Sequence, residues 1–347
     1  MGWDYIINEA LSEGPKYADG LRVKVIGVGG GGCNSISRLS RMGLNSELIA
    51  VNTDEMHVKS LNVSKKIILG RNRTYGRGAG GNMLTAETIA EQAASSLYKI
   101  VDGADIVFVL AALGGGTGGG AGPVIARLAR ESRALVVSIV TMPFKVEGTQ
   151  RWAQAQEALG KFKNSSNTVI VLDNNRLLKL APQIPIKKAF MVMDVLISDL
   201  IKNVVETVNT PSFINIDYSD LEAIMRRGGT STVLYGEGEY YSPEDAVVDA
   251  LNNPLMDIDY RGATGALIHI TGGPSMTLRT VYRISEGITS GIRDDAHIKI
   301  GARIDDRYRN KIKVSTILTG VHTPYAQSKE VDVPSVGSIG DFIPMVY

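Results

Sequence analysis

Three short glycine-rich segments could bind phosphate, and each lies between an apolar run and a helix-like stretch. They are GVGGGG (27–32), GRGAGG (76–81) and GGGTGGGAG (114–122). Because glycine has no side chain, such a turn before a helix lets backbone N–H groups approach a phosphate closely. Three turns on one sheet edge would surround a polyphosphate from several sides. Glycines that serve only tight turns would explain one of these segments more easily than all three.

The first segment also fits a dinucleotide site. Gly27, Gly29 and Gly32 match the GxGxxG fingerprint, and Asp54 follows at about the spacing of the acid that binds a ribose. An NAD-dependent oxidoreductase is therefore an alternative, although the sequence offers no candidate acid or base for hydride transfer. The GxxxxGK[ST] phosphate loop does not occur in the sequence.

Apolar strands alternating with helices must position these segments. The stretches with strand character are 22–28, 47–54, 65–70, 105–113, 134–143 and 167–175. Continuous apolar strands separated by helices predict a parallel sheet covered on both faces, and thus an α/β fold. We expect the helix after the third glycine segment to run from about Pro123 to Ser132.

The second half of the chain has a different pattern. A long apolar helix over 189–208, about 30 Å in length, should be buried between layers or domains. Ser219 and Glu222 match a capping box and predict the start of the next helix. The segments after it predict an α+β domain, with helices at 243–252 and 277–290 and strands at 265–273, 297–304 and 311–321.

Composition excludes several classes of protein. The 347 residues have a net charge of +1, so no global field attracts nucleic acid. Cys33 is the only cysteine, which rules out an intrachain disulfide and fits a reducing cytoplasm. The four histidines lack metal-binding spacing, so we expect no protein-built metal site. There is neither a secretory signal nor an apolar stretch of about 20 residues, so direct membrane insertion is not expected.

The sequence resembles the tubulin/FtsZ family. GGGTGGG (114–120) is similar to the family signature GGGTG[ST]G, and further matching motifs follow the family's order. These are GVGGGGCN (27–34), VNTD (51–54), GRGAGGN (76–82), PFKVEGTQR (143–151), DNNRLL (173–178), AFMVMD (189–194) and NIDYSD (215–220). The resemblance covers about residues 20–322 and is closer to FtsZ, in its archaeal form, than to tubulin.

The resemblance implies a Rossmann-like GTPase domain with a parallel sheet, a long central helix and an α+β C-terminal domain. The implied segments are an N-terminal helix and linker (1–20), a GTP-binding domain (21–183), the central helix (184–209), a C-terminal GTPase-activating domain (210–325) and a tail (326–347).

The resemblance also assigns residues to GTP, with Mg²⁺ held mainly by its phosphates. The first loop, the γ-phosphate loop and the signature loop would contact the phosphates and nearby sugar. Glu147 and Arg151 would contact the ribose, and Asn174 and Asp194 the base. The loop residues are Gly30, Gly31, Gly32, Cys33, Asn34, Ala79, Gly80, Gly115, Gly116, Thr117 and Gly118.

Some of these residues have simpler interpretations. Glu147 and Arg151 are spaced i, i+4, as in a surface ion pair. Asp194 could accept the N1–H and N2–H of guanine, which favours GTP over ATP, or could be paired within the protein. Cys33 is expected to be a packed thiol more than a reactive one. Gly119 replaces the usual Ser or Thr of the signature, which removes one hydroxyl.

The resemblance places the hydrolytic groups in NIDYSD. Asp217 and Asp220 would orient a water with help from Asn215, although acids before a helix also stabilise its dipole. The long helix would carry these acids away from their own chain's phosphates. They should therefore act on the nucleotide of the next subunit, and a head-to-tail contact that does not close produces a filament.

The expected protein is a cytoplasmic, self-assembling GTPase of the cell-division ring that binds GTP, GDP and Mg²⁺. The apolar end of the tail, GDFIPMVY (340–347), could bind a membrane-tethering adaptor or pack back on the protein. A predicted amphipathic helix over 3–12 could serve packing or a partner. A relative that controls cell shape, or one that regulates without hydrolysis, remains an alternative.

Overall fold

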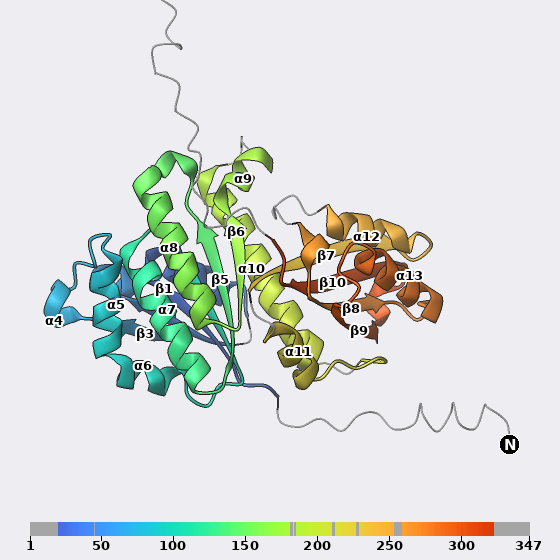
Figure 1. The fold of residues 1–347 in the computed structure, drawn as a ribbon, viewed down its shortest axis with the longest axis horizontal. Helices are drawn as coiled ribbons and strands as arrows, with labels where there is room; N and C mark the ends of the chain where they lie inside the picture. The colour runs from blue at the N-terminus through green and yellow to red at the C-terminus, as the bar shows by residue number, and fades with distance from the viewer. Residues whose placement is uncertain are drawn as a thin grey trace, which may run out of the picture.

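The computed structural model of the chain describes residues 20–44, 46–180, 183, 185–209, 212–226, 229–252 and 259–322 (Figure 1). The predicted N-terminal helix at 3–12 and the predicted tail at 326–347 lie outside these residues. None of the helices within the described ranges is long and apolar enough to cross a membrane.

Ten strands form one sheet in the order β3-β2-β1-β4-β5-β6-β7-β10-β8-β9. The strands are β1 (Val23–Val28), β2 (Glu47–Asn52), β3 (Lys65–Ile68), β4 (Ile106–Ala112), β5 (Leu135–Met142), β6 (Thr168–Asp173), β7 (Thr230–Glu239), β8 (Gly265–Gly272), β9 (His297–Ile304) and β10 (Lys311–Thr319). Strands β1 to β6 pair in parallel, which confirms the α/β prediction. Their order is that of the doubly wound dinucleotide-binding folds, in which ligands bind where the strand order reverses. That point lies between β1 and β4.

Helices cover both faces of the parallel part (Figure 1). Helices α2, α10 and α11 supply buried side chains to the core on one face, and α5 to α8 to the core on the other. The helices are α2 (Gly29–Arg41), α3 (Glu55–Ser60), α4 (Arg71–Thr74), α5 (Met83–Gln92), α6 (Ala94–Val101), α7 (Gly116–Glu131), α8 (Thr149–Ser165), α9 (Asn174–Leu180), α10 (Ile186–Asn209), α11 (Tyr218–Met225), α12 (Pro243–Leu251) and α13 (Leu278–Thr289), with 3₁₀ turns η1 (Lys145–Glu147), η2 (Tyr260–Gly262) and η3 (Asp306–Tyr308).

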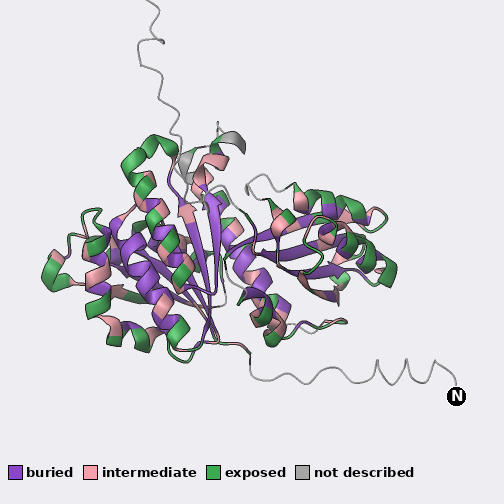
Figure 2. Cartoon of the chain, viewed as in Figure 1, coloured by how far each residue is buried: buried purple, intermediate pink, exposed green. Residues whose placement is uncertain are grey.

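Strands β1, β2, β4, β5 and β6 are largely apolar because both of their faces are buried (Figure 2), whereas the edge strand β3 begins with two exposed lysines. In β4, Phe108 joins the core under α2 and α10, whereas Val107 and Val109 join the core under α5 to α8. This is the alternation of a pleated strand between two helical layers.

The C-terminal part is mixed, with antiparallel β7, β10 and β8 and a parallel β8–β9 pair. Two residue pairs, Val169 with Thr230 and Ile170 with Ser231, join β7 to β6 and make the sheet continuous. Helix α10 lies between the two halves (Figure 1) and buries one face, while Met191 and Val195 on its other side are exposed. The expected burial of this helix therefore holds for one face only.

Helix α7 begins at Gly116, seven residues before its expected start near Pro123, which lies inside the helix. The later glycines of the signature are helical and closely packed. An added Cβ at Gly119 would lie 2.6 Å from Met83 Sδ, and one at Gly120 would lie 2.2 Å from the Met83 carbonyl oxygen. These glycines let α7 pack directly against α5, which propensity alone did not predict.

Strand β7 and helix α8 were not predicted from the sequence. The glycines of β7 obscured its strand pattern, and their role is tertiary. An added Cβ at Gly236 would lie 2.1 Å from the Ala246 carbonyl oxygen, so β7 requires glycine where α12 crosses it.

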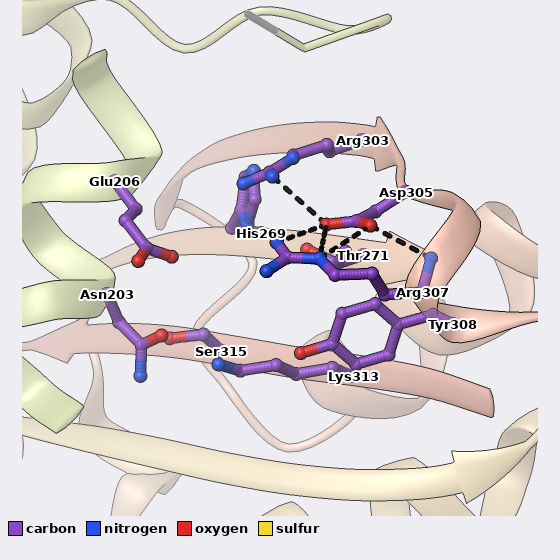
Figure 3. Close-up of a pocket in the computed structure, with 10 residues that line it drawn as sticks. All are labelled: Asn203, Glu206, His269, Thr271, Arg303, Asp305, Arg307, Tyr308, Lys313 and Ser315. Atoms are coloured by element: carbon purple, nitrogen blue, oxygen red, sulfur yellow. Dashed lines mark hydrogen bonds and ion pairs between the residues drawn. The ribbon is translucent and has the colours of Figure 1, made fainter. Parts of the chain in front are cut away.

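A polar seam separates α10 from the C-terminal sheet (Figure 3). Asn203 and Glu206 of α10 face Arg303, Lys313 and the η3 turn across a cavity of about 30 Å³. Asp305 accepts hydrogen bonds from Arg303 and Arg307, and these guanidinium groups hold its pKa near 2. The seam therefore contains satisfied ion pairs in place of an apolar contact.

His269 in this seam should make folding stability depend on pH. It is 7% exposed, and burial, together with Arg303 and Lys313, lowers its pKa to about 4. Because the unfolded chain binds the proton near the ordinary histidine pKa of about 6.5, the free energy of unfolding should fall by about 3 kcal/mol between that pH and pH 4. Denaturant unfolding at several pH values should show this fall, and His269→Gln should remove it. Parallel pH profiles of the two proteins would contradict the assignment.

Candidate nucleotide-binding site

Two helices begin at the carboxyl ends of the adjacent strands β1 and β4. Helix α2 begins at Gly29 directly after β1, and α7 begins at Gly116 four residues after β4. The later glycines of the first segment therefore form the first turn of α2. Free N–H groups at both helix starts point out of the sheet edge, where they can bind an anion.

The glycines of these loops fall into two groups. Gly32 and Gly118 are needed for packing, since an added Cβ would lie 2.2 Å from the Leu110 carbonyl oxygen and 2.8 Å from that of Ala112. A Cβ at Gly31 would lie 2.3 Å from Ala112 Cβ. Gly30 and Gly115 instead have no atom within 4 Å of such a Cβ, and neither has a positive φ. Neither packing nor backbone conformation explains glycine at these two positions.

The third loop, residues 76–81, also contains glycines that face open space. Gly80 and Gly81 have φ of 58° and 79°, and no atom lies within 4 Å of a Cβ at either. The loop is attached to β2 because the Gly78 N–H donates to the Thr53 carbonyl oxygen at 3.2 Å. Ala79 lies half-buried between these anchored and open positions. All three glycine segments thus present uncovered backbone at the same end of the sheet.

Thr117 is buried, and its hydroxyl lies 2.7 Å from the Thr53 hydroxyl. Gly116 is also packed, since its Cβ would lie 2.9 Å from the Asn82 nitrogen. Of the two threonine hydroxyls, one donates to the other, so one hydroxyl hydrogen stays available. The expected side-chain donor of the signature is therefore shared between Thr117 and Thr53.

A cavity of about 250 Å³ extends from these loops toward α10. It brings together residues that the sequence placed on separate motifs, and it includes the ring of Phe144, which meets Phe190 edge-on with centroids 6.3 Å apart. The predicted residues that line it are Gly31, Gly32, Asn34, Glu147, Arg151, Asn174 and Asp194.

Asp194 is 2% exposed and forms an ion pair with Arg38 of α2. Arg38 Nε donates to one carboxylate oxygen and its Nη2 to the other at 3.2 Å. The protein pairing that the sequence left open for Asp194 is therefore present. Arg38 was not predicted as a site residue, although its i+4 spacing from Asn34 on α2 places the two residues on one helix face.

Glu147 and Arg151 also form the ion pair left open by their spacing, with 3.1 Å between Arg151 Nε and Glu147 Oε2. The second Glu147 oxygen accepts a hydrogen bond from the Phe144 N–H at 2.7 Å. Both side chains are thus fixed at the cavity rim. The neighbouring Asn175 follows β6 and accepts a hydrogen bond from the Lys145 N–H, which ties the rim to this end of the strand. Asn174 lines the cavity.

Cys33 and Asn34 differ in the direction of their side chains. The Cys33 thiol donates to backbone carbonyl oxygens within the sheet, and burial raises its pKa to about 12. It is the packed thiol that we expected. Asn34 lines the cavity, and its Oδ1 lies 2.9 Å from His57 Nε2. The His57 Nδ1 lies 3.1 Å from the Asn52 amide nitrogen, so the ring is held between Asn34 and Asn52.

The predicted hydrolytic residues lie elsewhere, at the other end of α10 (Figure 1). Ile216 is buried, and its neighbours Asn215 and Asp217 are exposed. The loop is fixed to β9 by two backbone hydrogen bonds of 3.0 Å between Ile214 and Ala302. The structure therefore does not bring these residues to the cavity of their own chain.

Asp217 and Asp220 form the capping box of α11, so the predicted pairing of Ser219 with Glu222 is wrong. The Asp220 N–H donates to Asp217 Oδ1 at 2.8 Å, and the Asp217 N–H donates to Asp220 Oδ2 at 3.4 Å. The same S/T/D-x-x-D/E spacing occurs two residues earlier, and a carboxylate is a strong N-cap. The acids thus cap the helix, as the simpler interpretation held.

No group of three or more His, Cys, Asp or Glu side chains in the described residues could hold a metal ion.

Comparisons with known proteins agree with this geometry. The GTPase-domain model of the tubulin/FtsZ family matches residues 22–182, and the C-terminal-domain model of the FtsZ family matches residues 229–322. The first match includes the glycine segment and Asp54 that suggested a dinucleotide, so the comparison favours GTPase over oxidoreductase.

Individual relatives support the same assignment. The cell division protein FtsZ 2 of Haloferax volcanii is 44% identical over 322 residues, which is 92% of this chain and 79% of that protein. A solved FtsZ dimer from M. jannaschii has a TM-score of 0.77 at 33% identity, covering 96% of this chain and 99% of that one. CetZ1 from Haloferax volcanii has a TM-score of 0.75 at 21% identity over 88% and 96% of the chains, a likeness of fold alone. The chain belongs to the tubulin/FtsZ family of GTPases, and within that family to FtsZ.

Proposed function

We propose that this protein assembles head to tail into filaments of the cell-division ring and hydrolyses GTP at each subunit junction. The observation that carries the proposal is the separation of its two functional sites. Helix α10 has 24 residues and is about 36 Å long, with the glycine loops at one end and Asp217 at the other. The acids can serve a phosphate only on a neighbouring copy. Because this contact is heterologous, repeating it extends a filament.

The glycine loops provide the phosphate cradle. Gly30 and Gly115 face open space from the first turns of α2 and α7, and Gly80 faces it from the third loop. A triphosphate would accept hydrogen bonds from the uncovered N–H groups there. Bound Mg²⁺ would sit mainly on phosphate oxygens and supply charge neutralisation, since no group of three or more His, Cys, Asp or Glu in the described residues could hold it.

The guanine base would occupy the cavity beside α10. Asp194 could accept both N1–H and N2–H of guanine, and adenine offers no such donor pair. Its present partner Arg38 must then leave, so nucleotide binding exchanges one pair of charge-assisted hydrogen bonds for another. This exchange keeps the buried carboxylate satisfied with and without nucleotide.

Hydrolysis would use the exposed side chains of residues 215–220, which lead into α11 and are called the α11 loop below. A water held by Asp217 and Asn215 forms the new bond to the γ-phosphorus while the bond to the GDP oxygen breaks, and the proton ends on the released phosphate. Such a reaction depends on positioning and charge more than on covalent chemistry. Because the water and the phosphate come from different subunits, only assembled protein turns over GTP.

The remaining assignments rest on the sequence and the family. The functional segments are the GTP-binding domain (21–183), the central helix (184–209) and the GTPase-activating domain (210–325). The protein would act in the cytoplasm at the division site, and the apolar residues near the end of the tail would bind a membrane-tethering adaptor.

The two glycines that face open space, Gly30 and Gly115, should be needed for nucleotide binding and not for folding. Gly30→Ala and Gly115→Ala should weaken GTP binding by about tenfold or more, because a methyl group enters the space left for phosphate. Their melting temperatures should stay near wild type, since no atom lies near the added Cβ. Gly160→Ala on α8, where the space is also open, is the matched control: it should leave GTP affinity unchanged and keep the melting temperature at or slightly above that of wild type. Gly120→Ala should lower the melting temperature through its clash with Met83. Unchanged GTP affinity in both Gly30→Ala and Gly115→Ala would exclude the cradle.

Asp194→Asn should reduce the preference for GTP over ATP. The amide replaces an acceptor by a donor facing guanine N1–H, so we expect GTP affinity to fall about tenfold or more while ATP affinity changes little. Asp199→Asn removes an exposed acid from the same helix and should leave both affinities unchanged. Equilibrium binding of both nucleotides measures the ratio. An unaltered ratio in Asp194→Asn would assign base recognition to other residues.

Specific GTPase activity should rise with protein concentration above a threshold, and Asp217→Asn should abolish it with GTP binding retained. Asparagine is itself a good N-cap, so this variant keeps α11 while removing the carboxylate. Mixing Asp217→Asn with Gly115→Ala subunits should restore part of the activity, since one variant supplies the pocket and the other the acid. Activity independent of concentration, or a mixture no more active than its parts, argues against a shared site.

A further inference from the structure

The carboxylate oxygens of the α11 loop are not equally engaged. Asp217 Oδ1 and Asp220 Oδ2 accept the capping hydrogen bonds, and Asp220 Oδ1 lies 2.6 Å from Lys299 Nζ. Asp217 Oδ2 is the one oxygen of the four without a partner among the described residues. The two acids therefore differ, with Asp220 held from both sides and Asp217 presenting a free acceptor.

Lys299 reaches this loop from β9, the edge strand of the sheet. The hydrogen bond and charge of Asp220, with a smaller effect of Asp217, raise the pKa of Lys299, so it stays protonated at neutral pH. Its side chain is 38% exposed and that of Asp220 is 22% exposed. The cation thus lies on the same accessible surface as the two acids.

The position of Lys299 reduces an electrostatic repulsion in the proposed contact between subunits. Two carboxylates that approach a triphosphate are repelled by its negative charge, and the repulsion grows as water is excluded from the contact. A cation fixed beside the acids offsets one of their charges in advance. Fixed in this way, it requires no reorganisation when the surfaces meet.

We propose that Lys299 is a positioning residue for GTP hydrolysis. It holds the Asp220 carboxylate, so that Asp217 keeps a free oxygen for the attacking water, and it offsets the acidic charge where the loop meets the neighbouring subunit's phosphates. The inference rests on the proposed function, because it requires the loop to act on another subunit's nucleotide.

A purely structural role makes a different prediction. An exposed ion pair stabilises a fold only slightly, so its loss alone would leave folding and catalysis nearly unchanged. Retention of the fold with loss of turnover therefore distinguishes positioning from stabilisation.

The test compares Lys299→Met with Lys299→Arg in the full chain. Sedimentation with GTP gives the polymer mass, and phosphate release gives the rate per sedimented subunit. We expect Lys299→Met to lower that rate about ten- to a hundredfold, because small misplacements of catalytic groups have effects of this size. Lys299→Arg keeps the charge and should recover most of the rate. Both should bind GTP as monomers like wild type. Arg283→Met breaks another exposed ion pair of this domain, with Glu244, and should have no effect.

Co-assembly covers the case in which Lys299→Met does not polymerise alone. In mixtures with wild type, the rate per sedimented subunit should fall in proportion to the variant fraction, since each variant subunit impairs one junction. A wild-type rate per sedimented subunit in Lys299→Met polymers or mixtures would overturn the inference, as would failure of Lys299→Arg to recover activity. Failure of the proposed function looks different, because wild-type activity itself would then not depend on concentration.

Discussion

Close approach of backbone to backbone at the carboxyl ends of β1 and β4 is the constraint on which the site depends. Gly32 and Gly118 allow α2 and α7 to begin directly against β4 and the end of β1, where any side chain would meet a carbonyl oxygen. This packing directs two sets of free helical N–H groups toward one point. Once the two helix starts are fixed by packing, Gly30 and Gly115 are left facing open space. The same interaction thus organises the core and forms the cradle.

Pairing of charges is the second principle of the molecule. Three acids around the cavity and on the α11 loop each form an ion pair with a basic side chain: Asp194 with Arg38, Glu147 with Arg151 and Asp220 with Lys299. A paired carboxylate has a fixed direction, which a catalytic or binding group requires. Asp217 is different because one of its carboxylate oxygens has no partner among the described residues, and this asymmetry is the basis for proposing that Asp217 holds the attacking water.

The rigid length of α10 connects these two features to assembly. One face of the helix packs into the core of the parallel sheet, and the polar seam on the C-terminal side contains Asn203 and Glu206. In the proposed function, this length keeps the acids away from the nucleotide of their own chain, which would couple hydrolysis to filament growth.

Local features could be predicted from the sequence because they depend on neighbouring residues. The alternation of apolar strands and helices, the three glycine segments and the order of the motifs were sufficient for the α/β class, the family and seven of the residues that line the cavity. The start of α7 was predicted wrongly because close packing against α5 overrode the low helix propensity of glycine. The start of α11 was wrong for a local reason, since Asp217 with Asp220 caps the helix in place of Ser219 with Glu222.

Only the tertiary structure could separate the packing glycines from the open ones, because the two kinds are identical in sequence. The tertiary structure also determined which charged side chains form ion pairs. Arg38 and Asp194 are 156 residues apart in the sequence, and Lys299 on strand β9 reaches Asp220 in helix α11. Glycine patterns and motif order are local and can be read along the chain, whereas open space and distant ion pairs exist only after the chain has folded.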